Sequence, residues 1–178
     1  ELISTTADEI KSVGFNALNI DRKERSLDKN YAPTDKKPFK EGEFWNGIAY
    51  NGCHFVGNYR LTDIQIIENT ISATSPSSSS YGLGYPIKVV PNKEYYCSCG
   101  KTSGSVIVNI GYFDKDGVWL KSQSINVVNN KFTIPSNVYW ALVIINSTSV
   151  NTKFTVENLC INLVHTGYRN GEYEPYKE

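Results

Sequence analysis

The stretch Val138-Tyr-Trp-Ala-Leu-Val-Ile-Ile145 decides the fold class. Every position in it is apolar or aromatic, so it lacks the two-residue alternation of a strand with one face in water. A strand of this kind lies inside a sandwich, where both of its faces are covered. Phe132-Thr-Ile134 leads into it through the turn residues Pro135-Ser-Asn137. The pattern predicts a short strand, a turn and an interior strand.

Further short strands, separated by turn signals, are expected on both sides of this stretch. Asp114-Lys-Asp-Gly117 favours a hairpin turn over a calcium loop, because Gly supplies the positive φ and no terminal Glu follows at the required spacing. No amphipathic helix of three turns is evident after residue 44. The fold predicted is all-β, an antiparallel β-sandwich of the jelly-roll or galactose-binding-like type. Its strands are expected at 13–20, 48–56, 59–73, 86–90, 94–99, 106–113, 118–120, 132–134, 138–145 and 154–163.

Two of these runs change their apolar parity, which a regular strand cannot do. The change between Ile66 and Ile67 predicts two strands or one bulged strand, and a second change falls at Glu157-Asn158. Ser75-Pro-Ser-Ser-Ser-Ser80 is of low complexity and is expected to be a loop, which Tyr81-Gly-Leu-Gly-Tyr85 extends.

The length of 178 residues suits a single domain. Residues 1–12 are interpreted as a linker or tail, with a short helix as an alternative, and residues 13–178 as one β-sandwich domain. Within it, residues 21–47 are expected to form a charged, irregular insertion, because mixed charges are followed by Pro33, Pro38 and Gly42. The first strand at 13–20 and the last run from Cys160 to Val164 are expected to be neighbours.

Charge excludes several classes of partner. Lys and Arg number 18, as do Asp and Glu, so the net charge is zero. A duplex-binding protein normally carries a basic face, and no apolar run here approaches the length that spans a bilayer. We therefore expect no nucleic-acid partner and no membrane insertion.

The sequence carries no recognisable motif for metal, cofactor or catalysis. The four cysteines, Cys53, Cys97, Cys99 and Cys160, do not have the spacing of common zinc sites, so buried thiols are the favoured interpretation. The two histidines, at positions 54 and 165, lie in no nucleophile motif. A small hydrolase would need two carboxylates facing one another, and no carboxylate stands in a distinctive context. Neither an enzyme nor a cofactor is expected.

Aromatic residues give the better lead, because sugar C–H faces stack on aromatic rings while Asn and Arg bind hydroxyl groups. Rings in turn-rich or glycine-rich segments are expected to be at least partly exposed, whereas Trp119 and Trp140 lie in strand patterns and are expected in the core. The residues predicted to bind a glycan are Trp45, Asn46, Asn58, Arg60, Tyr81 and Tyr85.

Two end motifs and a central series carry a family resemblance. Val13-Gly-Phe-Asn-Ala-Leu-Asn19 and the closing segment Cys160 to Tyr176, with Arg169-Asn-Gly-Glu-Tyr-Glu-Pro-Tyr176, resemble tail or fibre structural proteins of phages and prophages of gut anaerobes. The series Pro86 to Tyr96, Gly111 to Gly117 and Phe132 to Tyr139 resembles carbohydrate-binding-like β-sandwich modules of such proteins. The family has no well-defined catalytic residues to carry over.

The resemblance implies a non-enzymatic module of a phage tail or fibre that binds a host-surface carbohydrate. Its partners would be the glycan and either further copies, as a homotrimer, or other tail proteins, and its location would be the virion. Two alternatives stay open: a secreted or surface polysaccharide-binding adhesion protein of a gut bacterium, and a purely architectural virion module.

Overall fold

The computed structural model describes residues 12–14, 45–48, 60–76, 82–123 and 130–163. Within these ranges every helix or strand element is a β-strand, and every strand pair is antiparallel. No helix in the described part of the chain is long and apolar enough to cross a membrane. The strands are β1 (Ser12–Gly14), β2 (Trp45–Ile48), β3 (Thr62–Ile67), β4 (Thr70–Ser75), β5 (Gly82–Lys88), β6 (Glu94–Ser98), β7 (Thr102–Ser103), β8 (Val106–Phe113), β9 (Trp119–Gln123), β10 (Asn130–Thr133), β11 (Trp140–Ser147), β12 (Thr152–Glu157) and β13 (Cys160–Leu163).

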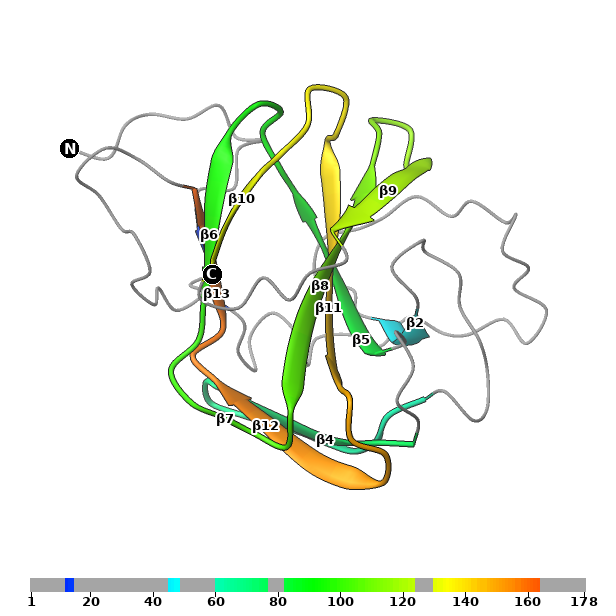
Figure 1. The fold of residues 1–178 in the computed structure, drawn as a ribbon, viewed down its shortest axis with the longest axis vertical. Coiled ribbons are helices and arrows are strands. Elements are labelled where there is room, and N and C mark those ends of the chain that lie inside the picture. The colour runs from blue at the N-terminus through cyan, green and yellow to red at the C-terminus, as the bar shows by residue number, and fades with distance from the viewer. Residues whose placement is uncertain (1–11, 15–44, 49–59, 77–81, 124–129, 164–178) are drawn as a thin grey trace.

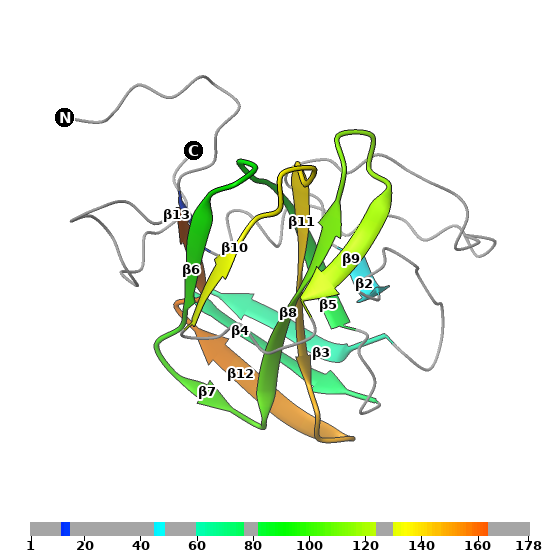
Figure 2. The same cartoon turned by 45° about the horizontal axis from the view of Figure 1, so that its top comes forward.

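The strands form two layers around one main core. A five-stranded sheet, in the order β2-β5-β11-β8-β9, makes one layer. Two four-stranded sheets, β1-β13-β6-β10 and β3-β4-β12-β7, make the other, and Figures 1 and 2 show them beside and below the five-stranded sheet. Each sheet supplies side chains to the main core, for example Val143, Tyr95 and Phe154. The predicted all-β antiparallel sandwich is confirmed.

Strand β11 occupies the centre of the five-stranded sheet, as its apolar run from Trp140 to Ile145 predicts. It pairs with β5 on one side and with β8 on the other. Val143 belongs to the main core, whereas Leu142 and Ile144 belong to a second apolar cluster on the opposite face. Both faces of this strand are therefore buried, because successive side chains point to opposite sides of a sheet.

Both expected parity changes are confirmed. Ile66 and Ile67 end β3, and a turn through Glu68, which has a positive φ of 51°, leads into β4. Asn158, with a φ of 55°, separates β12 from β13. The expected pairing of the first and last strands is confirmed for the described residues, with Val13 opposite Ile161.

Two local expectations were wrong. The segment Gly82 to Tyr85 is not a loop, because β5 begins at Gly82 and lies between β2 and β11. A Cβ atom at Gly84 would collide with the side chain of Ile48, so the glycine allows β2 and β5 to pack closely. Trp45 lies in β2 rather than in an irregular segment. The expectations for 1–11, 15–44, 49–59, 77–81 and 164–178 fall outside the described residues.

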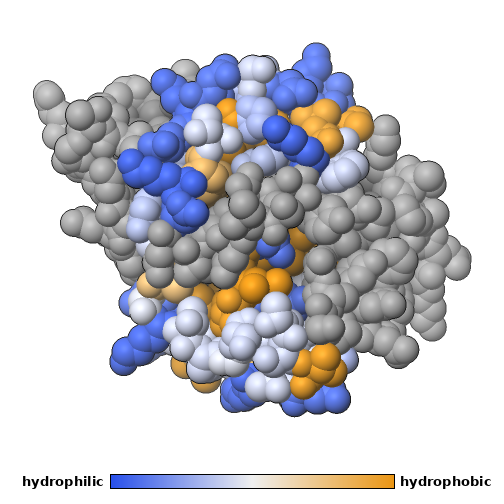
Figure 3. Space-filling model, viewed as in Figure 1, coloured by the Kyte–Doolittle hydropathy of each residue, from blue (hydrophilic) through white to orange (hydrophobic). Residues whose placement is uncertain are grey.

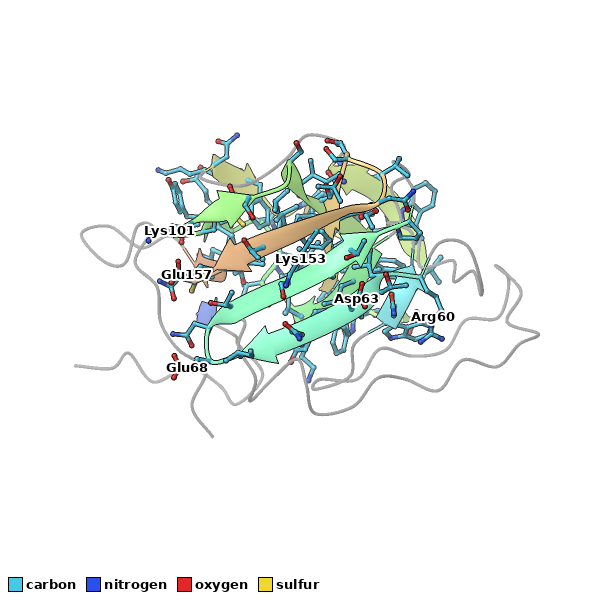
Figure 4. All side chains as sticks on the ribbon, turned by 90° about the horizontal axis from the view of Figure 1, so that it is seen from below. Arg60, Asp63, Glu68, Lys101, Lys153 and Glu157 are labelled. Carbon is cyan, nitrogen blue, oxygen red and sulfur yellow. The ribbon has the colours of Figure 1, made fainter. Side chains whose placement is uncertain are left out.

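The sheet β3-β4-β12-β7 has one face against the main core and an outward face rich in hydroxyl groups. Gln65, Ser72, Thr155 and Ser103 form one row across its four strands. Figure 4 looks onto this sheet and shows Asp63 and Lys153 on the side that faces the viewer. We call it the hydroxyl face, and its hydroxyl residues are Thr62, Thr70, Ser72, Thr74, Ser103 and Thr155.

Candidate functional site

The candidate site is a row of side chains that crosses four neighbouring strands of the five-stranded sheet. Trp140 on β11 is the register partner of Lys88 on β5 and of Phe113 on β8. Phe113 is in turn the partner of Trp119 on β9. Cross-strand partners lie side by side on one face of a sheet. We call Lys88, Trp140, Phe113 and Trp119 the aromatic row, and the side of the sheet that carries it the aromatic face.

The aromatic row lies where the second apolar cluster meets solvent. That cluster consists of Trp45, Ile48, Phe113, Leu142 and Ile144, all buried, with Trp140 packed against it. Exposure is uneven along the row: Trp140 on β11 is partly buried, Phe113 on β8 is buried, and Trp119 on the edge strand β9 is 42% exposed. The row therefore packs on a buried apolar cluster, and the rings of Trp140 and Trp119 reach the surface.

The β8–β9 hairpin fixes the position of Trp119. The Asp114 carboxylate accepts the backbone N–H groups of Asp116 at 2.9 Å and Val118 at 2.8 Å, and Gly117 adopts a φ of 76°. The register shifts by one residue between Tyr112 and Phe113, which is a β-bulge. The predicted hairpin is confirmed. It holds the ring on a rigid, hydrogen-bonded strand rather than on a free loop.

Lys88 lies at the other end of the row, beside Trp140. Its Nζ atom is 5.7 Å from the centroid of the Trp140 ring. An ammonium at this distance is attracted by the electron-rich face of the indole. The contact holds a positive charge at the edge of an otherwise apolar row.

The residues predicted from sequence do not form this site. Trp45 is 3% exposed and belongs to the second cluster, while Tyr85 is 6% exposed and belongs to the main core. Their expected exposure was wrong, because both lie on strands whose faces are covered. The Asn46 side chain is buried and binds the Leu61 backbone, donating to its carbonyl at 3.1 Å and accepting its N–H at 2.8 Å.

The remaining predicted residues also lie apart from the row. Arg60 precedes β3, at the edge of the sheet that carries the hydroxyl face (Figure 4). Asn58 and Tyr81 lie outside the described residues.

Sequence reasoning placed Trp119 and Trp140 in the core, and the structure corrects this. Trp119 begins the edge strand β9, and Trp140 begins β11 shortly after the turn at Ser136-Asn137. Strand ends and edge strands have fewer covering neighbours than strand centres, so their rings reach the surface. Proximity to the Gly117 turn and to the Pro135 turn was the signal in the sequence that could have identified them.

Exposed apolar surface is otherwise scattered. On the face drawn in Figure 3, the described surface is hydrophilic along its upper rim, and hydrophobic residues reach it in small separate patches. The large hydrophobic side chains that are well exposed among the described residues are Ile67, Trp119, Tyr139 and Val150. Of these, Trp119 belongs to the aromatic row.

The other reactive groups of the described residues are placed for packing. Cys97, Cys99 and Cys160 carry thiols rather than disulfides. Burial raises the pKa of Cys97 far above its ordinary value, and the neighbouring Cys99 and Cys160 raise it further. This thiol therefore stays protonated and unreactive. Asn146 in the sequon Asn146-Ser-Thr148 is fully buried, so the folded chain cannot present it to a glycosylating enzyme.

No cluster of His, Cys, Asp or Glu in the described ranges could hold a metal ion. Both histidines and Cys53 lie outside these ranges. The arrangement at the aromatic row offers ring faces and one ammonium group, which can bind a ligand by stacking and by charge.

No protein-family model and no curated protein matches the chain. Accessory secretory proteins 1, 2 and 3 of Streptococcus pneumoniae give a solved structure with a TM-score of 0.49 at 15% identity, over 67% of this chain and 96% of the other. A CBM4 structure gives 0.42 at 11% identity, over 68% and 86%. The enzymatically active domain of bacteriophage CBA120 tailspike protein 4 gives 0.34 at 16% identity, over 61% and 17%. Likenesses this low assign no function.

Proposed function

We propose that this chain is a non-enzymatic carbohydrate-binding β-sandwich module whose platform is the aromatic row. The observation that carries the proposal is the alignment of Trp140, Phe113 and Trp119 on three adjacent strands, in which Trp119 is exposed and Trp140 partly exposed on either side of the buried Phe113. Sugars present C–H faces that pack on such rings. The hydrogen-bonded sheet beneath the rings keeps them in fixed positions, which lowers the entropy lost when a ligand binds.

The chemistry of the row supports binding rather than hydrolysis. A glycosidase needs two carboxyl groups that flank the bond to be cleaved. The row contributes the rings of Trp140 and Trp119 and one ammonium, and the Asp114 carboxylate beside it accepts two backbone N–H groups of its own turn. We therefore assign the row no catalytic step.

The setting we propose is a phage tail or fibre, with a glycan of the host surface as the ligand. The support is the sequence resemblance of the two end motifs, and the described parts of those motifs pair directly as β1 and β13. In the alternative setting, the chain is a surface or secreted polysaccharide-binding protein of a bacterium. Mass spectrometry of purified virions, compared with the cell-surface fraction, distinguishes the two settings.

A glycan array followed by calorimetry tests the binding function. Replacing one exposed ring, as in Trp119→Ala, is expected to weaken binding about two- to tenfold, the range of a single aromatic stacking contact. Tyr139→Ala is the matched control, because Tyr139 is 45% exposed and is not part of the row. It is expected to bind as the wild type does.

Two outcomes would overturn the proposal. One is that the folded wild-type chain binds no glycan on the array. The other is that Tyr139→Ala and Trp119→Ala weaken binding equally, which would move the ligand away from the row. Circular dichroism of each variant checks that the fold is kept.

A further inference from the structure

We propose that the ligand of the aromatic row is an acidic polysaccharide, and that Lys88 recognises its carboxylate group. This inference rests on the proposed carbohydrate-binding function and adds the class of sugar. It is carried by the position of Lys88, which continues the row on β5 as the register partner of Trp140.

The spacing of the strands sets how a sugar chain fits. Neighbouring strands lie about 4.8 Å apart, so Trp140 and Trp119, two strands apart, are separated by roughly 10 Å. A pyranose ring is comparable in width with one strand spacing. Phe113 between them is buried, so an extended chain that crosses the strands can contact Trp119 and Trp140 but not Phe113, and it places the next substituent beside Lys88.

The charge of the row selects among sugars. Lys88 is the one ionisable side chain among the four row residues. Its ammonium is a donor without acceptor capacity, and a hydrogen bond from it to a carboxylate is stronger than one to a neutral hydroxyl. A sugar acid gains this interaction, a neutral sugar does not, and an amino sugar with a free ammonium is repelled.

The contact between Lys88 and Trp140 positions the ammonium where it can bind a sugar carboxylate. With Nζ 5.7 Å from the ring centroid, the charge is already held next to the stacking surface before a ligand arrives. A carboxylate on the sugar stacked over Trp140 reaches the ammonium without a large movement of the side chain. The indole and the ammonium together define a subsite for a uronic acid.

The test uses polygalacturonate, alginate and hyaluronate, each compared with its carboxyl-reduced form, which keeps the sugar chain and removes the charge. Calorimetry at low and high salt measures the affinity of the wild type, Lys88→Gln, Lys88→Arg and Lys153→Gln. Lys153 is the matched control, because it lies exposed on the opposite layer of the sandwich (Figure 4).

We expect the wild type to bind at least one acidic polymer more tightly than its reduced form, with an affinity that falls as salt rises. Lys88→Gln is expected to lower that affinity about fivefold and to leave binding of the reduced polymer unchanged. Lys88→Arg is expected to retain most of the preference, and Lys153→Gln all of it.

Equal binding of acidic and reduced polymers, or an equal loss for both in Lys88→Gln, would overturn the inference and leave the carbohydrate-binding function in place. Binding of neutral glycans alone on the array would do the same. Failure of every glycan, acidic or neutral, would overturn both the inference and the proposed function.

Discussion

The aromatic face and the hydroxyl face are the outward sides of opposite layers, and they differ in how far their side chains are buried. On the aromatic face, Leu142 and Ile144 are fully buried in a second apolar cluster. On the hydroxyl face, Lys153 is exposed and Thr155 partly exposed, while Phe154 between them is buried in the main core. The five-stranded sheet is therefore covered on both sides at its centre, whereas the sheet β3-β4-β12-β7 is covered on the side that faces the main core.

This difference determines where exposed rings can occur. Strand β12 alternates between polar and apolar residues, so its outward side chains suit water. Strand β11 is apolar from Trp140 to Ile145 and needs cover on both faces. The candidate site lies at the end of the covered region, where the rings of Trp140 and Trp119 continue the apolar cluster into solvent.

The largest expected effect tests whether the aromatic face carries a true second core. Leu142→Ala removes a fully buried side chain and leaves a cavity, so it should lower the free energy of unfolding by about 2–5 kcal/mol. Urea denaturation measures the change.

Thr155→Ala on the hydroxyl face is the counterpart. Its hydroxyl lies 2.7 Å from that of Ser103 in an exposed contact, so the expected loss is below about 1 kcal/mol. Comparable losses in Leu142→Ala and Thr155→Ala would contradict the distinction between the two faces.

A smaller effect is expected where the two layers are joined. Asn46 on β2 binds both the N–H and the carbonyl of Leu61, one residue before Thr62 begins β3. Asn46→Ala leaves these backbone groups without that partner and should cost about 1–3 kcal/mol. Asn130→Ala, at an exposed position, is the control and should change stability little. Thermal unfolding measures the melting temperature of both variants. Equal melting temperatures would contradict a stabilising role for the hydrogen bonds between Asn46 and Leu61.

The smallest effect concerns the core side of the five-stranded sheet and has the opposite sign. The buried Tyr112 hydroxyl has no hydrogen-bond partner among the described residues, so Tyr112→Phe should stabilise the fold by about 1 kcal/mol. Tyr95→Phe should destabilise it by a similar amount, because the Tyr95 hydroxyl accepts the Val90 N–H at 3.0 Å. Chemical denaturation of both variants at neutral pH measures these changes.

Alkaline pH sharpens the Tyr112 prediction. Burial raises the pKa of Tyr112 from 10.0 to about 12, so the folded state keeps the proton that the unfolded state loses first. The free energy of unfolding therefore keeps its full value below pH 10, where Tyr112 is protonated in both states. It falls as the pH rises toward 12, by at most about 1.4 kcal/mol per pH unit. The advantage of Tyr112→Phe over the wild type should therefore widen above pH 10. A constant difference would contradict the assignment.

The elements of the fold followed from local signals. The turn at Asp114 to Gly117 and the break at Asn158 were predicted because turn residues and apolar parity are properties of adjacent positions. The candidate site did not follow, because exposure of a ring depends on which other strand covers it. Tyr85 looked exposed between glycines and serines, yet its strand lies between β2 and β11.

The sequence by itself determined that short antiparallel strands form a sandwich and where most of them turn, since backbone conformation responds to neighbouring residues. Tertiary structure alone decided that Trp45 and Tyr85 are buried while Trp119 and Trp140 reach the surface. The physical reason is that burial depends on strand order. Central strands are covered by segments distant in the chain, and an edge strand such as β9 is covered by fewer of them.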